Sequence, residues 1–391
     1  MRKLGKQLLE AFKKGDLVLL VLCVVATAFG CLIIASTTAA TDAGATRYLL
    51  IQIGASLAGI LMYVFISSIN TETLAEHRAF LVLFNTGLLL MLLPFGQTIS
   101  GNRSWLSFPF LPFNIQPAEI CKISYILIAA SVMVAHQNKI SSFKSIFHMT
   151  LHLGMVAGLN LFISGDAGVS LIFLGIFLGM AICGGVRLIW FLLAGGLVAT
   201  VFPFIWNVAM GDYQRLRFEA IWNNALDPNG TGVRYQIVRA LRSLTGGGMT
   251  GQGLFQGHRT QTPGALFAQH TDFIFCAIGE ELGFIGCAFV LVLLFLIVAR
   301  CIWVGTRSHD TLRRLVCFGV ASSLIFQIIV NVGMCLEVMP VIGLTLPFIS
   351  YGGSSIVSLY AMMGLVSGVH ARPAPTSQER YIHPPKSKSF L

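Results

Sequence analysis

The chain has 391 residues, of which 55% are hydrophobic and only 11% are charged, and its mean hydropathy is +0.78. This composition excludes a soluble globular protein with a wet surface and predicts a polytopic membrane protein. The formal net charge of +10 needs no nucleic-acid partner, because topology bias and attraction to anionic lipid explain most of it.

Apolar stretches of roughly 20 residues span a bilayer as helices, and they predict an all-α integral membrane protein with about ten transmembrane helices. The first stretch follows a basic segment, but it is too long for a secretory signal and further spans follow, so we expect a retained helix. The predicted membrane domain is 16–372, between a basic segment 1–15 and a cytoplasmic tail 373–391. The predicted spans are 16–36, 49–68, 79–95, 117–136, 146–163, 167–185, 188–209, 273–304, 315–336 and 344–369.

Basic residues predict the orientation of these spans. The N-terminal segment, the tail and the short loops with Arg78, Lys139 and Arg187 fall on one face, whereas the opposite short loops hold only Arg47 and Arg103. The positive-inside rule therefore predicts that both termini are cytoplasmic.

One connection, 211–271, is long and external, and the positive-inside rule does not apply to the several arginines in so long a loop. Within it, Val233, Ile237 and Leu241 follow helical spacing, which predicts an amphipathic helix lying on the outer leaflet. The glycine-rich run at 246–257 lacks the Lys-Ser/Thr pair of a phosphate loop, so nothing here indicates a nucleotide site.

Ionisable residues in a membrane are costly and therefore mark a functional site. The predicted topology brings a set of polar residues to the outer face: Trp105, Asp166, Asp272 and Asn331. Glu280 and Glu281 would lie roughly 12 Å below Asp272, at about 1.5 Å per helical residue. Together these groups predict an outward-facing cavity.

Glu119 and Lys122 are three residues apart and share one side of a predicted helix near the outer face. Two interpretations stand side by side. They form a neutralised pair that only joins helices, or Lys122 holds Asp272 or Glu280 in its charged form.

Asp272 is the candidate for chemistry. A carboxylate at the membrane surface, flanked by His270 and a partly buried cation, could act as a general base toward a hydroxyl, and a substrate presented at that depth would be lipid-linked. Less specific interpretations are a hydrogen-bonded loop histidine for His270 and an interfacial anchor for Trp105. The 9 cysteines are scattered, and no ligand signature demands a metal.

Several longer motifs follow one another along the chain: 101–105 (GNRSW), 116–119 (QPAE) with Lys122, 166–168 (DAG), 213–214 (YQ) with Arg217, 227–228 (DP), 270–275 (HTDFIF) with 280–283 (EELG), and Pro340 with 346–355 (LPFISYGGSS). In this order, and over nearly the whole chain, they resemble the SEDS proteins (shape, elongation, division and sporulation), the family of RodA, FtsW and SpoVE.

The resemblance implies a ten-helix peptidoglycan glycosyltransferase that polymerises lipid II, an undecaprenyl-pyrophosphate-linked disaccharide pentapeptide, at the outer face of the bacterial cytoplasmic membrane. It implies a class B penicillin-binding protein as crosslinking partner, within the elongation or division machinery. Asp272 matches the family's catalytic aspartate, which would deprotonate the acceptor sugar hydroxyl. Arg217, Lys122 or a divalent cation such as Mg²⁺ would meet the charge of the leaving pyrophosphate.

Asp272 is thus the predicted catalytic residue, and a wider set is expected to bind substrate or line the cavity. These residues are Trp105, Glu119, Lys122, Asp166, Arg217, His270, Glu280, Glu281, Asn331 and Ser350.

The chain departs from the family pattern at several points. It has 267–269 (FAQ) where Pro-Glu usually precedes the His-Thr-Asp, Glu337 where glycine is common, Ile342 where threonine is usual and Gly165 where proline is common. The run 253–257 (GLFQG) is closer to the elongation branch, which favours a RodA-like role. Division or sporulation members remain alternatives, because 344–347 (LTLP) also occurs in them.

Two other functions fit the same polar residues. A lipid II flippase would use the cavity as a path across the bilayer, and Asp272→Asn would stop transport without affecting polymerisation. A non-catalytic scaffold would recruit a transpeptidase through its apolar helices and would tolerate changes at Asp272. The place of Asp272 at the outer boundary, with few ionisable residues deeper in the spans, favours the enzyme.

Overall fold

The computed structural model describes residues 13–40, 45–99, 101–109 and 113–372. Most of the predicted basic segment 1–15 and the whole predicted tail 373–391 lie outside these ranges. The described chain is helical apart from one small hairpin and irregular connections, which confirms the predicted all-α membrane fold.

Nine helices of the described ranges are long and apolar enough to cross a membrane. The remaining predicted span, 167–185, forms a shorter apolar helix, α9 (Ala167–Cys183). The longer helices are α2 (Leu17–Thr38), α3 (Ala45–Ser68), α5 (Arg78–Leu90) with α6 (Leu92–Phe95), α7 (Pro117–Ala135), α8 (Phe143–Ser164), α10 (Leu188–Phe204) with the π-turn η2 (Ile205–Ala209), α13 (Ile274–Arg307), α14 (Thr311–Cys335) and α15 (Gly353–Ala371).

Short elements join these helices. Strands β1 (Gly96–Ile99) and β2 (Asn102–Leu106) form an antiparallel hairpin, in which Gln97 pairs with Trp105. The remaining elements are α4 (Thr71–Glu76), η1 (Gln137–Lys139), α11 (Asp212–Trp222), η3 (Asn224–Leu226) and α12 (Tyr235–Gly246).

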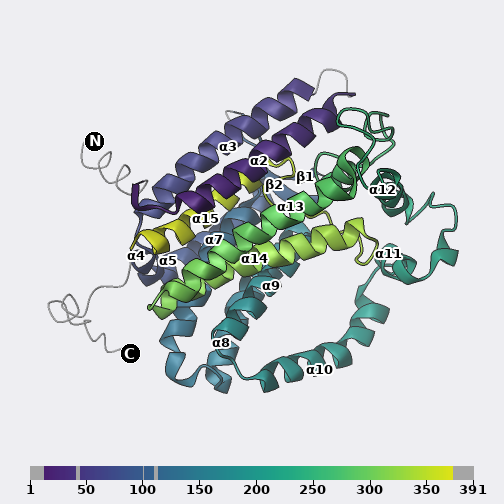
Figure 1. The fold of residues 1–391 in the computed structure, drawn as a ribbon. Coiled ribbons are helices and arrows are strands. Elements are labelled where there is room, and N and C mark those ends of the chain that lie inside the picture. Colours follow the sequence, from purple (N-terminus) through teal and green to yellow (C-terminus); the bar gives the residue numbers. More distant parts are fainter. Residues whose placement is uncertain (1–12, 41–44, 100, 110–112, 373–391) are drawn as a thin grey trace.

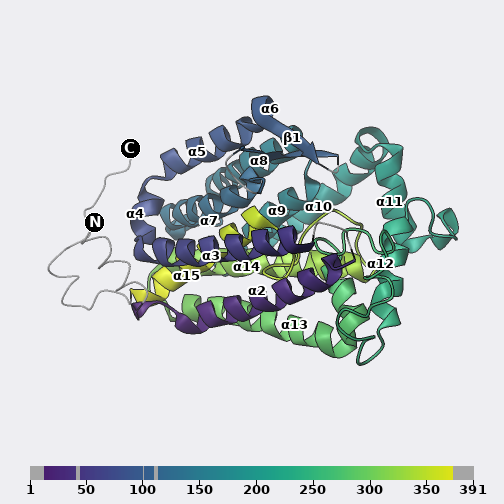
Figure 2. The same ribbon diagram turned by 90° about the horizontal axis from the view of Figure 1, so that it is seen from above.

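The bundle packs around α7, α14 and α15, whose residues are mostly buried. Helix α15 packs on α3, and α14 packs on both α13 and α9 (Figures 1 and 2). Helix α10 leaves this bundle in Figure 1 and has no buried residue among those described. Helices α11 and α12 lie at the end of the bundle opposite the start of α2 and the end of α15 (Figures 1 and 2).

The first and last helices therefore begin and end on one side, as an even number of spans requires. The backbone N–H of Asp16 donates to Ser367 Oγ at 3.1 Å, and the Asp16 carboxylate pairs with Arg300 at 2.8 Å. That this side faces the cytoplasm stays a prediction from the basic residues.

The prediction of a helix over 344–369 is wrong in its first part. Helix α15 begins only at Gly353, and the segment before it is irregular. Pro347 has no N–H to donate, and the positive φ of Gly343 (70°) and Phe348 (64°) cannot continue a helix. Hydropathy does not reveal this, because the segment is apolar and mostly buried.

Helix α13 contains a break that the apolar pattern also hides. Gly283 has φ 66° and ψ −163°, so the carbonyls of Glu280 and Glu281 lose their i+4 partners, the N–H groups of Phe284 and Ile285.

The glycine-rich loop replaces the two lost hydrogen bonds on both sides of the break. The N–H groups of Gln252 and Gly253 donate to Glu280 O and Glu281 O, both at 2.9 Å. In turn, Gly248 O and Met249 O accept from Phe284 and Ile285 at 2.9 and 3.2 Å. The backbone of the glycine-rich loop thus supplies the hydrogen-bond partners that the broken helix has lost.

The amphipathic helix predicted in the long loop is present as α12, and its place at the outer leaflet stays a prediction. Helix α12 packs on α13, and its buried residues are Ile237, Ala240 and Ser243. Its apolar face is therefore covered by protein.

Replacing Gly251 by alanine should destabilise the protein. The new Cβ would lie 2.1 Å from Glu281 O, at a φ of +82°. Forcing a side chain into such a contact costs about 1–3 kcal/mol, so the melting temperature of the purified protein should fall. Gly154→Ala is the control, because the added Cβ meets nothing within 4 Å in the described ranges. Equal melting temperatures for both variants would contradict the need for close approach.

Candidate active site

The segment that carries Asp272 is held by its backbone. Three consecutive carbonyls accept hydrogen bonds: His270 O from the Tyr351 N–H at 2.8 Å, Thr271 O from Ser350 Oγ at 2.6 Å, and Asp272 O from Asn331 Nδ2 at 2.8 Å. Every peptide group in front of α13 is thereby fixed. Asn331 and Ser350, both predicted as cavity residues, support the aspartate through its main chain.

The same two side chains also fix the irregular segment before α15. Ser350 Oγ accepts from Leu346 N–H at 2.8 Å, and Asn331 Nδ2 donates to Leu344 O at 2.6 Å. Gln52 of α3 completes the arrangement, because its side chain donates to Ser350 O at 3.2 Å and accepts from Gly352 N–H at 3.1 Å. The segment and the aspartate therefore keep one relative position.

The Asp272 carboxylate itself is left without such support. In the described part of the chain no group donates a hydrogen bond to it, and it lies beside Gly343, where an added Cβ would be 3.7 Å from Oδ2. Burial, and next the negative charge of Asp166, raises the pKa of the Asp272 carboxyl to about 6. A carboxylate with this pKa is a stronger base than an ordinary aspartate and is still ionised at neutral pH.

Asp166 is the carboxylate whose charge reaches Asp272. Its Oδ1 caps α9 by accepting from Val169 N–H at 3.0 Å, and its Oδ2 accepts from Gln116 Nε2, also at 3.0 Å. Burial raises the pKa of the Asp166 carboxyl, although the Val169 N–H opposes this. Asp166 thus has a structural role at the helix end besides its electrostatic one.

Glu119 and Lys122 form a buried ion pair, with Lys122 Nζ 2.8 Å from Glu119 Oε1 and 3.5 Å from Gln327 Oε1. Among the described residues Lys122 makes no ion pair with Asp272 or Glu280, so the hypothesis of such a direct pairing is wrong. The geometry matches the other interpretation, a neutralised pair, which lies within α7 and connects this helix to α14 through Gln327.

His270 packs against two tyrosine rings, which also contact each other. Its ring centroid is 4.8 Å from that of Tyr48 and 5.8 Å from that of Tyr351. Burial lowers the pKa of the His270 imidazole, which favours its neutral form. Trp105 is half-buried on β2, in the hairpin that precedes α7.

Glu280 and Glu281 do not border an open cavity, contrary to the expectation from sequence. Both are fully buried beneath the external loop. Glu281 accepts from Ser36 Oγ at 2.6 and 2.8 Å and from Thr260 Oγ1 at 2.7 Å, while Glu280 Oε1 accepts from Arg259 N–H at 2.5 Å. These carboxylates anchor the loop, because buried charges need such donors.

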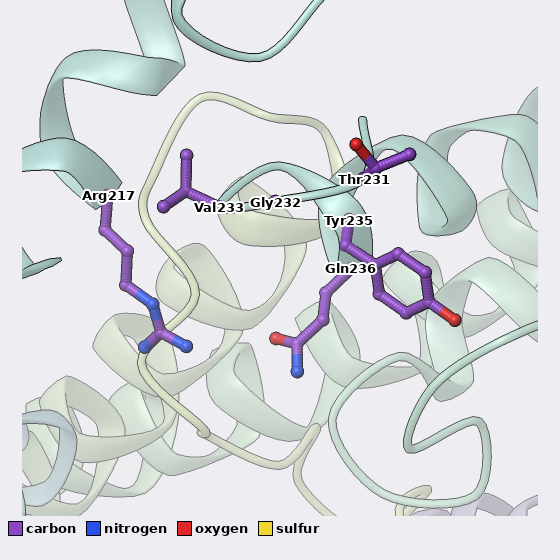
Figure 3. Close-up of a pocket in the computed structure, with 6 residues that line it drawn as sticks. All are labelled: Arg217, Thr231, Gly232, Val233, Tyr235 and Gln236. Carbon is purple, nitrogen blue, oxygen red and sulfur yellow. The ribbon is translucent and has the colours of Figure 1, made fainter. Parts of the chain in front are cut away.

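A pocket of about 330 Å³ lies between α11 and α12 (Figure 3). Arg217 of α11 reaches into it, and Nη1 of this guanidinium donates to Val341 O at 3.4 Å. The other lining residues are Thr231, Gly232, Val233, Tyr235 and Gln236. A polar pocket with one guanidinium suits an anionic group such as a phosphate.

Sequence reasoning found Arg217 but missed the other residues of this pocket, as well as Ser36 and Thr260. Small hydroxyl residues in apolar or loop segments carry no signal of their own. Gln116 was noticed only as part of a motif.

The described residues include no group of three or more His, Cys, Asp and Glu side chains that could hold a metal ion. Within these ranges the predicted divalent cation therefore finds no such cluster of ligands, and no step of the reaction is derived through it.

Comparison with known proteins gives a consistent picture. Residues 16–374 match the family model of FtsW, RodA and SpoVE, described as cell cycle protein. The chain is 32% identical over 376 residues to the probable peptidoglycan glycosyltransferase FtsW of Geobacter metallireducens, which covers 93% of this chain and 96% of that protein. It is 30% identical over 321 residues to the peptidoglycan glycosyltransferase MrdB of Escherichia coli K12, covering 82% of this chain and 84% of that protein.

Solved structures agree with these relatives. A chain from work on the structural coordination of polymerization and crosslinking by a peptidoglycan synthase complex superposes with a TM-score of 0.75 and 28% identity, covering 94% of this chain and 98% of that one. The rod shape determining protein RodA of Thermus thermophilus gives a TM-score of 0.67 and 27% identity, covering 91% and 96%.

Ser350→Ala should destabilise the segment that carries Asp272. The change leaves Thr271 O and Leu346 N–H without their partner, and an unsatisfied buried group costs about 1–3 kcal/mol. Thermal unfolding of the purified protein measures the loss. Ser355→Ala is the matched control, because the buried Ser355 Oγ has no partner among the described residues. Equal melting temperatures for the two variants would contradict the role given to Ser350.

Proposed function

The chain belongs to the FtsW, RodA and SpoVE family and is a peptidoglycan glycosyltransferase, and we propose that it polymerises lipid II with Asp272 as general base. One observation carries the proposal. The backbone of residues 270–272 is fixed at every carbonyl, yet the Asp272 carboxylate accepts no hydrogen bond from the described residues. A preorganised, unpaired carboxylate in front of a membrane helix is suited to take a proton from a substrate.

The proposed reaction has one proton transfer and one substitution. The carboxylate of Asp272 takes the proton of the acceptor sugar hydroxyl while that oxygen attacks the anomeric carbon of the growing lipid-linked chain. The bond from this carbon to undecaprenyl pyrophosphate breaks, and the pyrophosphate leaves with the bonding electrons. One glycosidic bond forms and one glycosyl-phosphate bond breaks.

The leaving pyrophosphate needs positive charge beside it. Of the two predicted cations, Lys122 is buried and bound to Glu119. Arg217 instead reaches a polar pocket next to the segment that continues from Val341 to Gly343, beside Asp272. The geometry therefore favours Arg217 for the pyrophosphate. A divalent cation such as Mg²⁺ remains part of the proposal; phosphate oxygens of the substrate would hold it more than side chains of this chain, and it would add positive charge beside the leaving group.

We further propose a class B penicillin-binding protein as the partner, at the outer face of the bacterial cytoplasmic membrane and with both termini of this chain inside. Support comes from the similarity to a chain of a peptidoglycan synthase complex that couples polymerization to crosslinking. The relatives include both FtsW and RodA-type proteins. The elongation role follows from the glycine-rich motif 253–257, with division and sporulation as alternatives.

The decisive experiment compares wild type with Asp272→Asn in a lipid II polymerisation assay on the purified protein with its transpeptidase, whose penicillin-sensitive site is blocked. The variant should lose activity by at least about 100-fold, the usual contribution of a general base. Asp212→Asn is the control, because this α11 carboxylate is 96% exposed.

Each alternative function gives a different result. Glycan strands from both wild type and Asp272→Asn would place the base elsewhere. Strands from neither, in folded and partnered preparations, would favour a scaffold. Lipid II movement across vesicles that Asp272→Asn abolishes, without polymer from either protein, would favour a flippase.

The raised pKa of Asp272 also predicts how polymerisation depends on pH. A general base must be ionised, so kcat/KM should reach half of its upper limit near pH 6, fall further below that pH and approach the limit toward neutral pH. An acid limb near the ordinary aspartate pKa of about 4 would contradict the burial described here. The fraction of folded protein, measured at each pH, separates this limb from unfolding.

A further inference from the structure

Glu337 stands at an unusual point of the backbone, just after the end of α14. Its φ is 60°, in the left-handed region where glycine is favoured. The turn is closed by Val338 and Met339, whose N–H groups both donate to Gly333 O, at 2.9 and 3.2 Å. A glycine would meet the backbone requirement better, so the glutamate side chain needs its own explanation.

The side chain of Glu337 is bound by Arg234, which immediately precedes α12. Nε of Arg234 donates to Glu337 Oε1 at 3.2 Å, and Nη2 donates to the same oxygen. The two side chains are only 9% and 16% exposed, so the pair is largely shielded from water and salt. This ion pair connects the external loop with the segment that leaves α14.

Arg234 is itself fixed from the other side. Its backbone N–H donates to Asp227 Oδ2 at 3.0 Å, which also accepts from Gly232 N–H at 2.8 Å, while Asp227 Oδ1 accepts from Thr231 N–H at 3.0 Å. The guanidinium therefore projects from a closed turn, and only the side chain of Arg234, not its backbone, must be ordered to hold Glu337.

A second connection runs parallel to the first. Arg217 of α11 donates to Val341 O at 3.4 Å. The segment 337–343 is thus held by both external helices, and it ends at Gly343, against Asp272 Oδ2.

We infer that the Arg234–Glu337 ion pair is a positioning device for the reaction. Together with the Arg217 contact from α11, it holds the start of α12 on segment 337–343 and so keeps the wall beside the Asp272 carboxylate in place. The inference rests on the proposed role of Asp272, and it makes Arg234 and Glu337 positioning residues that touch no reacting atom.

Four variants of the full-length chain test this. Arg234→Gln and Glu337→Gln each remove the charge attraction and should lower kcat by about 10- to 100-fold with little change in KM, as small misplacements near a reacting group do. The charge-reversed double variant R234E/E337R should recover most of the loss. Glu337→Gly separates the backbone from the charge, because it relaxes the positive φ yet removes the pair, and it should fold well and still lose turnover.

Hydrogen exchange of the amides in 338–343 provides a readout that needs no catalysis. Exchange should accelerate in the three variants that break the pair and return in R234E/E337R. Arg242→Gln is the matched control, because Arg242 is an exposed arginine of the same helix and should change neither exchange nor turnover.

The outcomes separate the two proposals. Full turnover and unchanged exchange in Glu337→Gly would overturn the positioning role. So would a double variant that recovers neither quantity although it unfolds at the wild-type temperature. A third outcome combines faster exchange in the single variants with a wild-type protein that makes no polymer. It would support the connection between loop and segment and refute the glycosyltransferase mechanism.

Discussion

The constraint on which the rest of this structure depends is that backbone polar groups at membrane depth must be paired within the protein. A helix meets it locally, but this chain abandons helical geometry at the Gly283 break and in the segment before α15. Each irregular stretch then borrows partners from another: residues 248–253 complete the break, and Asn331, Ser350 and Gln52 complete the segment that holds Asp272. The candidate active site therefore depends on backbone hydrogen bonds between segments that lie far apart in the sequence.

The same constraint separates two kinds of polar residue that look alike in the sequence. Glu281 is fully buried and its carboxylate accepts hydrogen bonds from several donors, so this side chain holds the loop in place. Among the described residues, Asp272 has donors only on its carbonyl, which leaves its carboxylate without a hydrogen-bond partner there. The hydrogen bonds that a carboxylate accepts from its neighbours, and not its presence in a span, distinguish an anchoring carboxylate from a reactive one.

Hydropathy was sufficient to predict the apolar helices and their order, because each of them contains a long apolar stretch. It could not predict where helices stop, since 344–352 is as apolar as a helix, and Gly283 reads as one more small residue. The motifs located Asp272, Asn331 and Ser350 but not their hydrogen bonds, which join residues about 60 to 80 positions apart. The sequence also left open which carboxylate pairs with Lys122. The structure shows that its partner is Glu119, three residues earlier in the same helix.

The broken helix also bears on how the chain is made. The glycine-rich loop leaves the ribosome before α13, yet its backbone partners become available only after α13 has entered the bilayer. Opened in lipid without the loop, the break would expose two carbonyls and two N–H groups, each costing roughly several kcal/mol. Helix α13 is therefore expected to insert as a continuous rod and to open when the loop docks, so that the end of the bundle with the candidate active site matures only after this insertion.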